Sequence, residues 1–138
     1  MKKLLIYNNE ISHYEIIESV ILKYNEILNI PKDDNLTIYL HATNDDLLKE
    51  HPTRIFEVQS FENYITTKYP KIIFGKITDY DYFINCTIYD RHYDSLNKNI
   101  DSNHKYIAHE ITERLKLNPN VYYLTPLSKQ NYLNANIL

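Results

Sequence analysis

The clearest indication of the fold is the segment His104–Leu127, HKYIAHEITERLKLNPNVYYLTPL. It begins with a short apolar strand, Tyr106–Ala108, and a polar turn that opens at His109. A short helix follows, and the stretch ends with a second apolar strand, Val121–Leu124. Two strands joined by so compact a helical crossover indicate a parallel β-α-β unit, and we expect earlier parts of the chain to repeat this plan.

Hydrophobic patterning predicts further strands and helices along the rest of the chain. The predicted strands are Lys3–Tyr7, Leu36–His41, Lys71–Phe74 and Tyr82–Thr87. The predicted helices are 11–28, with Ser12 as its N-cap, 60–69, which ends before Pro70, and 129–138, which Ser128 caps. Residues 45–59 leave two alternatives, an edge strand at Arg54–Val58 or one helical turn at Asp46–Glu50, and the polar residues 89–102 indicate a surface loop.

This order of elements favours an α/β fold. We predict a three-layer Rossmann-like domain with a mainly parallel sheet of about six strands, formed by residues 1–138 as a single domain.

The composition argues against several classes of function. A formal net charge of −3 and a pI near 6.0 provide no basic face, so we expect no nucleic-acid partner. The apolar run after Lys2-Lys3 is too short for a secretory signal or a membrane span, which favours a cytoplasmic protein. Gly75 is the single glycine, so neither a dinucleotide fingerprint nor a phosphate-binding P-loop exists in this chain.

Polar residues follow the predicted strands, and in parallel sheets the ligand crevice lies outside the carboxyl ends of the strands. They are Asn8, Asn9 and His13 after the first strand, His41 and Thr43 at the second, Thr87 and Asp90 at the fourth, His109 and Glu110 after the fifth, and Thr125 after the sixth. We expect His13 and His109 to carry any catalysis. We expect a substrate to contact Asn8, Asn9, His41, Thr87, Asp90 and Glu110.

Each histidine leaves two interpretations open. His109 is placed as a general base with Glu110 to orient it, or else Glu110 pairs with Arg114 on a solvated helix and His109 is a turn residue. His13, at the start of the long helix, binds or deprotonates a hydroxyl group, or else belongs only to the capping region.

We expect neither a metal ion nor a cofactor. The six histidines follow no metal-ligand spacing, and the chain has one cysteine. That residue, Cys86, lies inside an apolar strand, where an inert buried thiol is the common outcome.

Several strings resemble the amino-terminal half of the GT-B glycosyltransferases, and most of all the glycosyltransferase-like proteins of giant DNA viruses. An AT-rich viral genome would explain the surplus of Ile, Asn, Lys and Tyr. The strings are Lys3–Asn8, Ser12–Glu15, Tyr82–Asp90, His109–Leu115 and Tyr122–Leu127. The resemblance implies a metal-independent enzyme of two Rossmann-like domains. The amino-terminal domain binds the acceptor and often supplies the base, so His13 and His109 would face the cleft between the domains.

The resemblance also implies what is missing. The family binds its nucleotide-sugar on a second domain, for which these 138 residues leave no room. We therefore expect an acceptor-side domain that binds a glycan or another small acceptor and needs a second domain, a partner or a homo-oligomer for transfer. The final predicted helix stops abruptly, which favours a fragment or an evolved half. The alternative is a non-catalytic α/β binding or protein-interaction module of viral origin, in the host cytoplasm.

Overall fold

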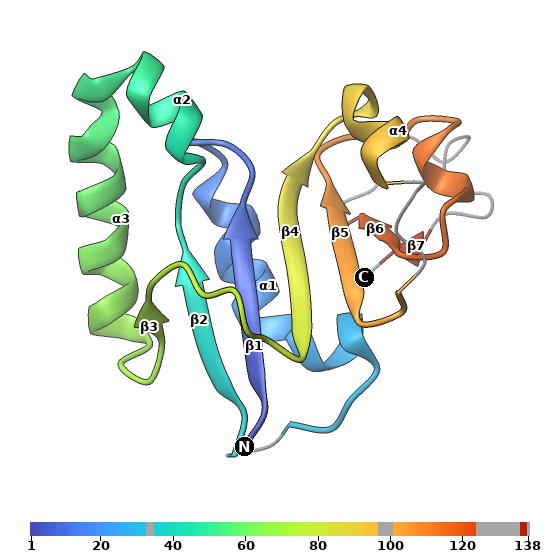
Figure 1. The fold of residues 1–138 in the computed structure, drawn as a ribbon, viewed down its shortest axis with the longest axis horizontal. Coiled ribbons are helices and arrows are strands. Elements are labelled where there is room, and N and C mark those ends of the chain that lie inside the picture. The colour runs from blue at the N-terminus through green and yellow to red at the C-terminus, as the bar shows by residue number, and fades with distance from the viewer. Residues whose placement is uncertain (33–34, 97–100, 124–135, 138) are drawn as a thin grey trace.

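The computed structural model describes residues 1–32, 35–96, 101–123 and 136–137. These residues form one sheet of seven strands in the order β3-β2-β1-β4-β5-β6-β7, with every neighbouring pair parallel (Figure 1). The strands are β1 (Lys3–Asn8), β2 (Thr37–His41), β3 (Ile73–Phe74), β4 (Tyr82–Ile88), β5 (His104–Ala108), β6 (Val121–Tyr123) and β7 (Asn136–Ile137). The predicted α/β, Rossmann-like fold is confirmed, with one strand more than expected.

Helices connect most of the strands. They are α1 (Tyr14–Leu28), α2 (Asp45–Glu50), α3 (Ile55–Lys68) and α4 (Tyr93–Leu96), with three short 3₁₀ helices, η1 (Pro52–Arg54), η2 (Asp90–His92) and η3 (Leu115–Leu117). No helix among the described residues is long and apolar enough to cross a bilayer.

The sheet separates two cores, because successive side chains of a strand point to opposite faces. On β5, Ile107 belongs to the core beneath α1 and α3. Its neighbours Tyr106 and Ala108 belong to a second core on the other face, together with Leu96 of α4 and Leu115 of η3. Helical elements therefore pack on both faces of the sheet, which gives the three predicted layers.

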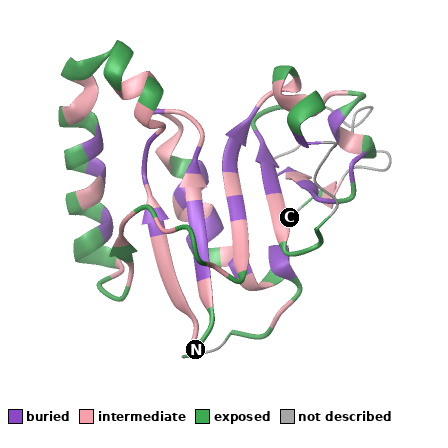
Figure 2. Cartoon of the chain, in the orientation of Figure 1, coloured by how far each residue is buried: buried purple, intermediate pink, exposed green. Residues whose placement is uncertain are grey.

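Aromatic rings cover one face of the sheet where a helix is missing. Residues 75–81 connect β3 to β4 without a helix and cross in front of β2 and β1 (Figure 1). On this face Phe83 stacks on Tyr7 and Tyr80 at ring-centroid distances of 6.4 and 5.4 Å, and His104 lies 5.5 Å from Phe83. Tyr7 stacks in turn on His41 at 5.4 Å. All of these ring-bearing residues are half-buried, the class coloured pink in Figure 2, so the row of rings covers this face of the sheet as a single thin layer.

The start of α1 differs from the prediction. The N-cap is His13 and not Ser12, and it has a left-handed backbone (φ 60°, ψ 42°) with no side-chain cap. The chain has to turn sharply here to pass from β1 into the helix. The side-chain amide of Asn8 donates a hydrogen bond to the carbonyl of Ser12 in this turn. At the other end Asn29 is also left-handed and its N–H donates to the carbonyls of Asn25 and Glu26, so the helix ends before Pro31.

Residues 45–59 are helical throughout most of their length, so the edge-strand alternative at 54–58 is wrong. The side chain of Asn44 accepts hydrogen bonds from the N–H groups of Asp46 and Leu47, which begins α2. After η1, α3 begins at Ile55, five residues before the predicted start at Ser60. The apolar side chain of Val58 packs into the core and makes this first turn part of the helix.

Two further predictions on local structure are corrected. The polar segment 89–102 is not only loop, since it contains η2 and α4, and the crossover after β5 contains the single 3₁₀ turn η3 in place of an α-helix. The predicted final helix lies largely outside the described residues, as do Leu124 and Thr125. Its described part, Asn136–Ile137, is a strand, because Asn136 pairs with Tyr122 and its amide donates to the carbonyls of Pro119 and Val121.

Candidate functional site

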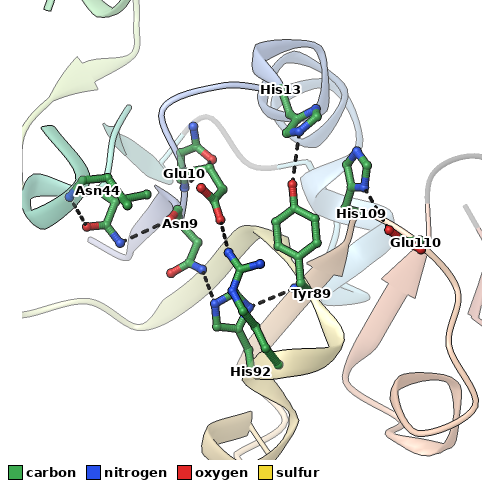
Figure 3. Close-up of polar contacts among 11 residues, drawn as sticks. Asn9, Glu10, His13, Asn44, Tyr89, His92, His109 and Glu110 are labelled. Carbon is green, nitrogen blue, oxygen red and sulfur yellow. Dashed lines mark hydrogen bonds and ion pairs between the residues drawn. The ribbon is translucent and has the colours of Figure 1, made fainter. Parts of the chain in front are cut away.

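The candidate site lies where the order of strands reverses. From β1 the chain continues to β2 on one side, and from β4 it continues to β5 on the other side, although β1 and β4 are neighbours. The loops that leave their carboxyl ends therefore diverge, and ligands of such sheets bind at this point. Three loops meet here: 9–13 after β1, 89–92 after β4 and 109–110 after β5 (Figure 3).

Three side chains from these loops form one cluster, which we call the ring cluster: His13, Tyr89 and His109. The imidazole centroids of His13 and His109 are 4.2 Å apart, and the Tyr89 ring is centred 5.1 Å from that of His109. The Tyr89 hydroxyl lies 3.1 Å from Nε2 of His13. The side chains of His13 and His109 are 30% and 33% exposed, so a ligand could reach both. The prediction that these two histidines lie together is confirmed.

Parallel pairing of the strands brings the ring cluster together. The N–H of Asn9 donates to the carbonyl of Cys86 and the N–H of His109 donates to that of Ile88, so both loops begin in line with β4. The left-handed backbone at His13 then turns its ring toward Tyr89. Strands with the same direction place their carboxyl ends at one edge, which is why residues 96 positions apart in sequence meet here.

A carboxylate lies beside each histidine. Glu15 is 3.6 Å from Nδ1 of His13, and Glu110 is 3.9 Å from Nδ1 of His109. The alternative in which Glu110 pairs with Arg114 on a helix is wrong, because residues 109–114 form no helix and Arg114 binds Asp90 at 2.6 Å. Both distances exceed that of a hydrogen bond, so the two carboxylates lie near the imidazoles without a bond that would fix their orientation.

Polar contacts tie the loop after β1 to the loop after β4. Glu10 accepts from Arg91 at 2.7 Å, and the side-chain amide of Asn9 lies 3.1 Å from Nε2 of His92 (Figure 3). The backbone N–H of Tyr89 donates to Nδ1 of the same His92 at 2.9 Å. Burial and the nearby Arg91 lower the pKa of His92, which favours the neutral ring that can accept this bond.

Arg91 also covers part of the ring cluster. Its guanidinium lies 4.5 Å from the centroid of the Tyr89 ring, an arrangement typical of cation–π contact. Burial, followed by the charge of Glu10, raises the pKa of the Tyr89 phenol, so the hydroxyl stays protonated and can donate to His13.

Asn8, predicted to contact a substrate, is fully buried. Its amide nitrogen donates to the carbonyls of Ala42 and Ser12 at 3.2 and 3.3 Å, and its side-chain oxygen accepts from the N–H of Glu10 at 3.3 Å. All three bonds go to backbone groups of the surrounding loops. Asn8 thus positions the turn that carries His13.

Thr87 and Asp90 also have structural surroundings. Thr87 is fully buried in a left-handed conformation (φ 60°) at an irregularity of the β4–β5 ladder, and its hydroxyl has no hydrogen-bond partner among the described residues. The Asp90 carboxylate accepts from Arg114 at 2.6 Å and from Thr112 at 2.8 Å. These bonds, with Arg114 the stronger influence, hold the pKa of Asp90 below its usual value. Asp90 therefore clamps the loop after β5 to the loop after β4.

His41 lies outside the ring cluster. It stacks on Tyr7 on the face of the sheet covered by aromatic rings, and its Nε2 is 3.2 Å from Asp45 without making an aligned hydrogen bond. Thr43, after β2, is buried, and within the part of the chain that the structure describes its hydroxyl has no hydrogen-bond partner. Of the predicted site residues, the structure thus gathers Asn9, His13, His109 and Glu110 at one point.

The described residues contain no group of three or more His, Cys, Asp or Glu side chains that could hold a metal ion. Cys86 is fully buried, and burial raises the pKa of its thiol well above the ordinary value, which makes it a poor nucleophile.

Tyr89, Arg91, His92 and Glu10 are not among the site residues predicted from the sequence. The usable signal was their position, since the first three follow directly on a predicted strand whose carboxyl end faces the crevice. Which of them points inward depends on η2, a local turn that the polar composition did not reveal. Comparison with protein-family models, with curated proteins and with solved structures gives no significant match for this chain.

Proposed function

We propose that this domain binds a hydroxyl-bearing acceptor at the ring cluster, in the manner of the acceptor-side half of a GT-B glycosyltransferase. One observation carries the proposal: His13, Tyr89 and His109 lie together at the carboxyl edge of the sheet, where the strand order reverses. The cluster consists of two imidazoles and a phenol, which can donate and accept hydrogen bonds, as the hydroxyl groups of a sugar require.

The chemistry of the cluster supports this choice of ligand. The bond between the Tyr89 hydroxyl and Nε2 of His13 is a hydroxyl–imidazole contact of 3.1 Å, the geometry that a general base needs toward an acceptor hydroxyl. An incoming acceptor hydroxyl would replace that of Tyr89 or bind beside it. Glu15 and Glu110 would then stabilise whichever imidazole takes up the proton.

Sugar transfer would also need a nucleotide-sugar site. The described residues carry no glycine-rich turn that could hold a diphosphate, so we assign this domain the acceptor role alone. A second domain or a partner protein would supply the donor and complete the reaction. A virus-encoded origin and a place in the host cytoplasm belong to the same proposal, and they rest on the resemblance of the sequence.

A panel of neutral glycans and methyl glycosides tests the proposal through the midpoint of thermal unfolding, since a ligand that binds only the native state raises it. We expect a concentration-dependent rise with at least one glycan and none with nucleotide-sugars. His13→Ala, His109→Ala and Tyr89→Phe should each abolish that rise. The control is His51→Ala, which removes an exposed histidine at the end of α2. If the three cluster variants keep the wild-type rise, the acceptor does not bind at the ring cluster.

A second candidate function is a non-catalytic binding module. The contacts of Glu10 with Arg91 and of Asn9 with His92 favour a non-catalytic module. In both contacts, polar side chains near the ring cluster bond to other groups of the protein and are not available to a substrate. In this case no glycan or nucleotide-sugar changes the midpoint. Glu10→Gln lowers the midpoint of the free protein but alters no ligand response.

A further inference from the structure

The turn that brings Tyr89 into the ring cluster is closed by two hydrogen bonds between Tyr89 and His92. The backbone N–H of His92 donates to the carbonyl of Tyr89 at 2.9 Å. In the other direction, the backbone N–H of Tyr89 donates to Nδ1 of the half-buried His92 ring, also at 2.9 Å (Figure 3). The ring of His92 thus helps to fix the course of the chain directly after β4.

The hydrogen-bond partners of the His92 ring determine where its proton lies. A neutral imidazole has one N–H donor and one acceptor nitrogen. Two N–H groups approach this ring, the backbone of Tyr89 at Nδ1 and the side-chain amide of Asn9 at Nε2, 3.1 Å away. The Asn9 amide can rotate and present its oxygen to Nε2, whereas a backbone N–H can only donate. Nδ1 is therefore the acceptor, and the proton of the neutral ring lies on Nε2.

A second proton on the His92 ring would turn Nδ1 into a donor. Two N–H groups would then face each other between Nδ1 and the backbone of Tyr89, so the hydrogen bond that closes the turn would be lost. Burial, followed by the charge of Arg91, lowers the pKa of His92, while the charge of Glu10 acts in the opposite direction. The ring of the folded protein is therefore neutral at pH 7 and takes up its second proton only below the ordinary histidine pKa of 6.5.

Tyr89 connects this turn to the other two members of the ring cluster. Its hydroxyl lies 3.1 Å from Nε2 of His13, and its ring is centred 5.1 Å from that of His109. The guanidinium of Arg91 lies 4.5 Å from the centre of the same ring. Among the described residues, His92 forms no hydrogen bond with His13 or His109, so it influences them through the position of Tyr89.

We propose that His92 is a positioning residue of the ring cluster, whose neutral ring holds Tyr89 against His13 and His109 and whose protonation releases it. In the free protein this coupling is independent of any ligand. Its consequence for binding rests on the proposed function: mild acidification weakens acceptor binding through a residue that lies outside the ring cluster. A pH dependence that came from His13 and His109 themselves would remain when His92 is replaced.

NMR spectroscopy of the free protein tests the coupling. Lowering the pH from about 8 to about 5 takes the His92 ring through its titration, which its own imidazole signals report. We expect nuclear Overhauser contacts between the rings of Tyr89 and His109 to weaken with the same midpoint as this titration. His92→Gln removes the titrating ring but leaves an amide oxygen that can accept from the N–H of Tyr89, so the contacts should persist over the whole range. His51→Gln, at an exposed histidine after α2, is the matched control and should behave as the wild type.

A second measurement concerns acceptor binding, with the panel of methyl glycosides as ligands. Between about pH 7.5 and about pH 5.5, the affinity of the wild type for a bound glycoside should fall at least about tenfold more than that of His92→Gln. A factor of this size is the effect of about one hydrogen bond.

Each outcome has a defined meaning. Ring contacts that weaken with the His92 titration in the wild type and persist in His92→Gln support the proposal. Contacts that persist in the wild type after His92 has taken up its second proton overturn it without the use of any variant, and so does equal weakening in His92→Gln. If the coupling is present but no glycoside binds at either pH, the proposed function fails and the positioning role of His92 stands. If a glycoside binds with the same pH dependence in both proteins, the positioning role fails and the acceptor site stands.

Discussion

Replacement of Asn8 by alanine should destabilise the protein more than the loss of any other single polar side chain at the site. Asn8 is fully buried, and its side chain makes three hydrogen bonds, all to backbone groups. Alanine leaves the N–H of Glu10 and the carbonyls of Ser12 and Ala42 without these partners. The cost therefore includes groups that stay behind and not only the side chain that is removed.

The size of the effect follows from these three bonds. A net hydrogen bond contributes about 1 kcal/mol, and a buried group left unpaired costs roughly 1–3 kcal/mol. The three bonds of Asn8 are long, at 3.2–3.3 Å, and only the one to Ala42 is buried. The carbonyl of Ser12 and the N–H of Glu10 lie in part-buried bonds, so water can partly replace Asn8 there. We therefore expect a loss of about 3 kcal/mol in the free energy of unfolding, which in a domain of this size lowers the melting temperature by roughly 10 °C.

Urea denaturation followed by circular dichroism measures this loss through the shift in the midpoint at constant slope. Asn9→Ala is the matched control, because Asn9 is half-exposed and its side chain makes one contact, with His92. It should lose less than about 1 kcal/mol. A loss below about 1 kcal/mol in Asn8→Ala, or equal losses in the two variants, would refute the assignment of Asn8 as the residue that holds the turn.

Three further predictions concern the sheet, the crevice and the thiol. Phe83→Leu should lower the free energy of unfolding, measured by urea titration, by about 1–2 kcal/mol, because leucine keeps apolar area but loses the ring contacts. An unchanged free energy of unfolding would mean that the row of rings does not stabilise the fold. Burial lowers the pKa of His92 in the folded chain, so the unfolded chain binds more protons below about pH 6.5. The free energy of unfolding of the wild type should therefore fall as the pH drops below about 6.5 and level off below the folded pKa of His92. His92→Gln should remove this part of the pH dependence. Identical pH profiles of the two proteins would contradict the burial of a neutral ring. Cys86 should react with a thiol reagent only at the rate of unfolding, and rapid labelling of the native protein, measured by mass spectrometry, would show that the thiol is accessible.

The fold class could be predicted because its signal is local. Buried parallel strands are short apolar runs, and such runs occur at β1, β2, β4 and β5. The helix 14–28 follows from the regular spacing of Ile16, Ile17, Val20 and Ile21. The predicted helix boundaries are less accurate where packing, and not helix propensity, sets them. The start of α3 is an example, because its first turn is fixed by the contact of Val58 with the core.

The site could be predicted in part. Parallel strands end at the same edge, so the meeting of His13 and His109 followed from the predicted topology alone. The roles of Asn8, Thr87 and His41 did not follow, because sequence position gives the edge of the sheet but not the direction in which a side chain points. Asn8 and Thr87 are fully buried, and the ring of His41 stacks on Tyr7 on the face of the sheet.

The amino-acid sequence is enough to predict the alternation of strands and helices and the edge at which polar residues gather, because hydrophobic period and chain order are properties of neighbouring residues. Contacts between distant loops, in contrast, fix which polar side chains are bonded to other groups of the protein. The pairing of Glu10 with Arg91 and of Asp90 with Arg114 depends on distances between loops that lie 81 and 24 residues apart along the chain. Such distances are set by the register of β1, β4 and β5, which no local pattern contains.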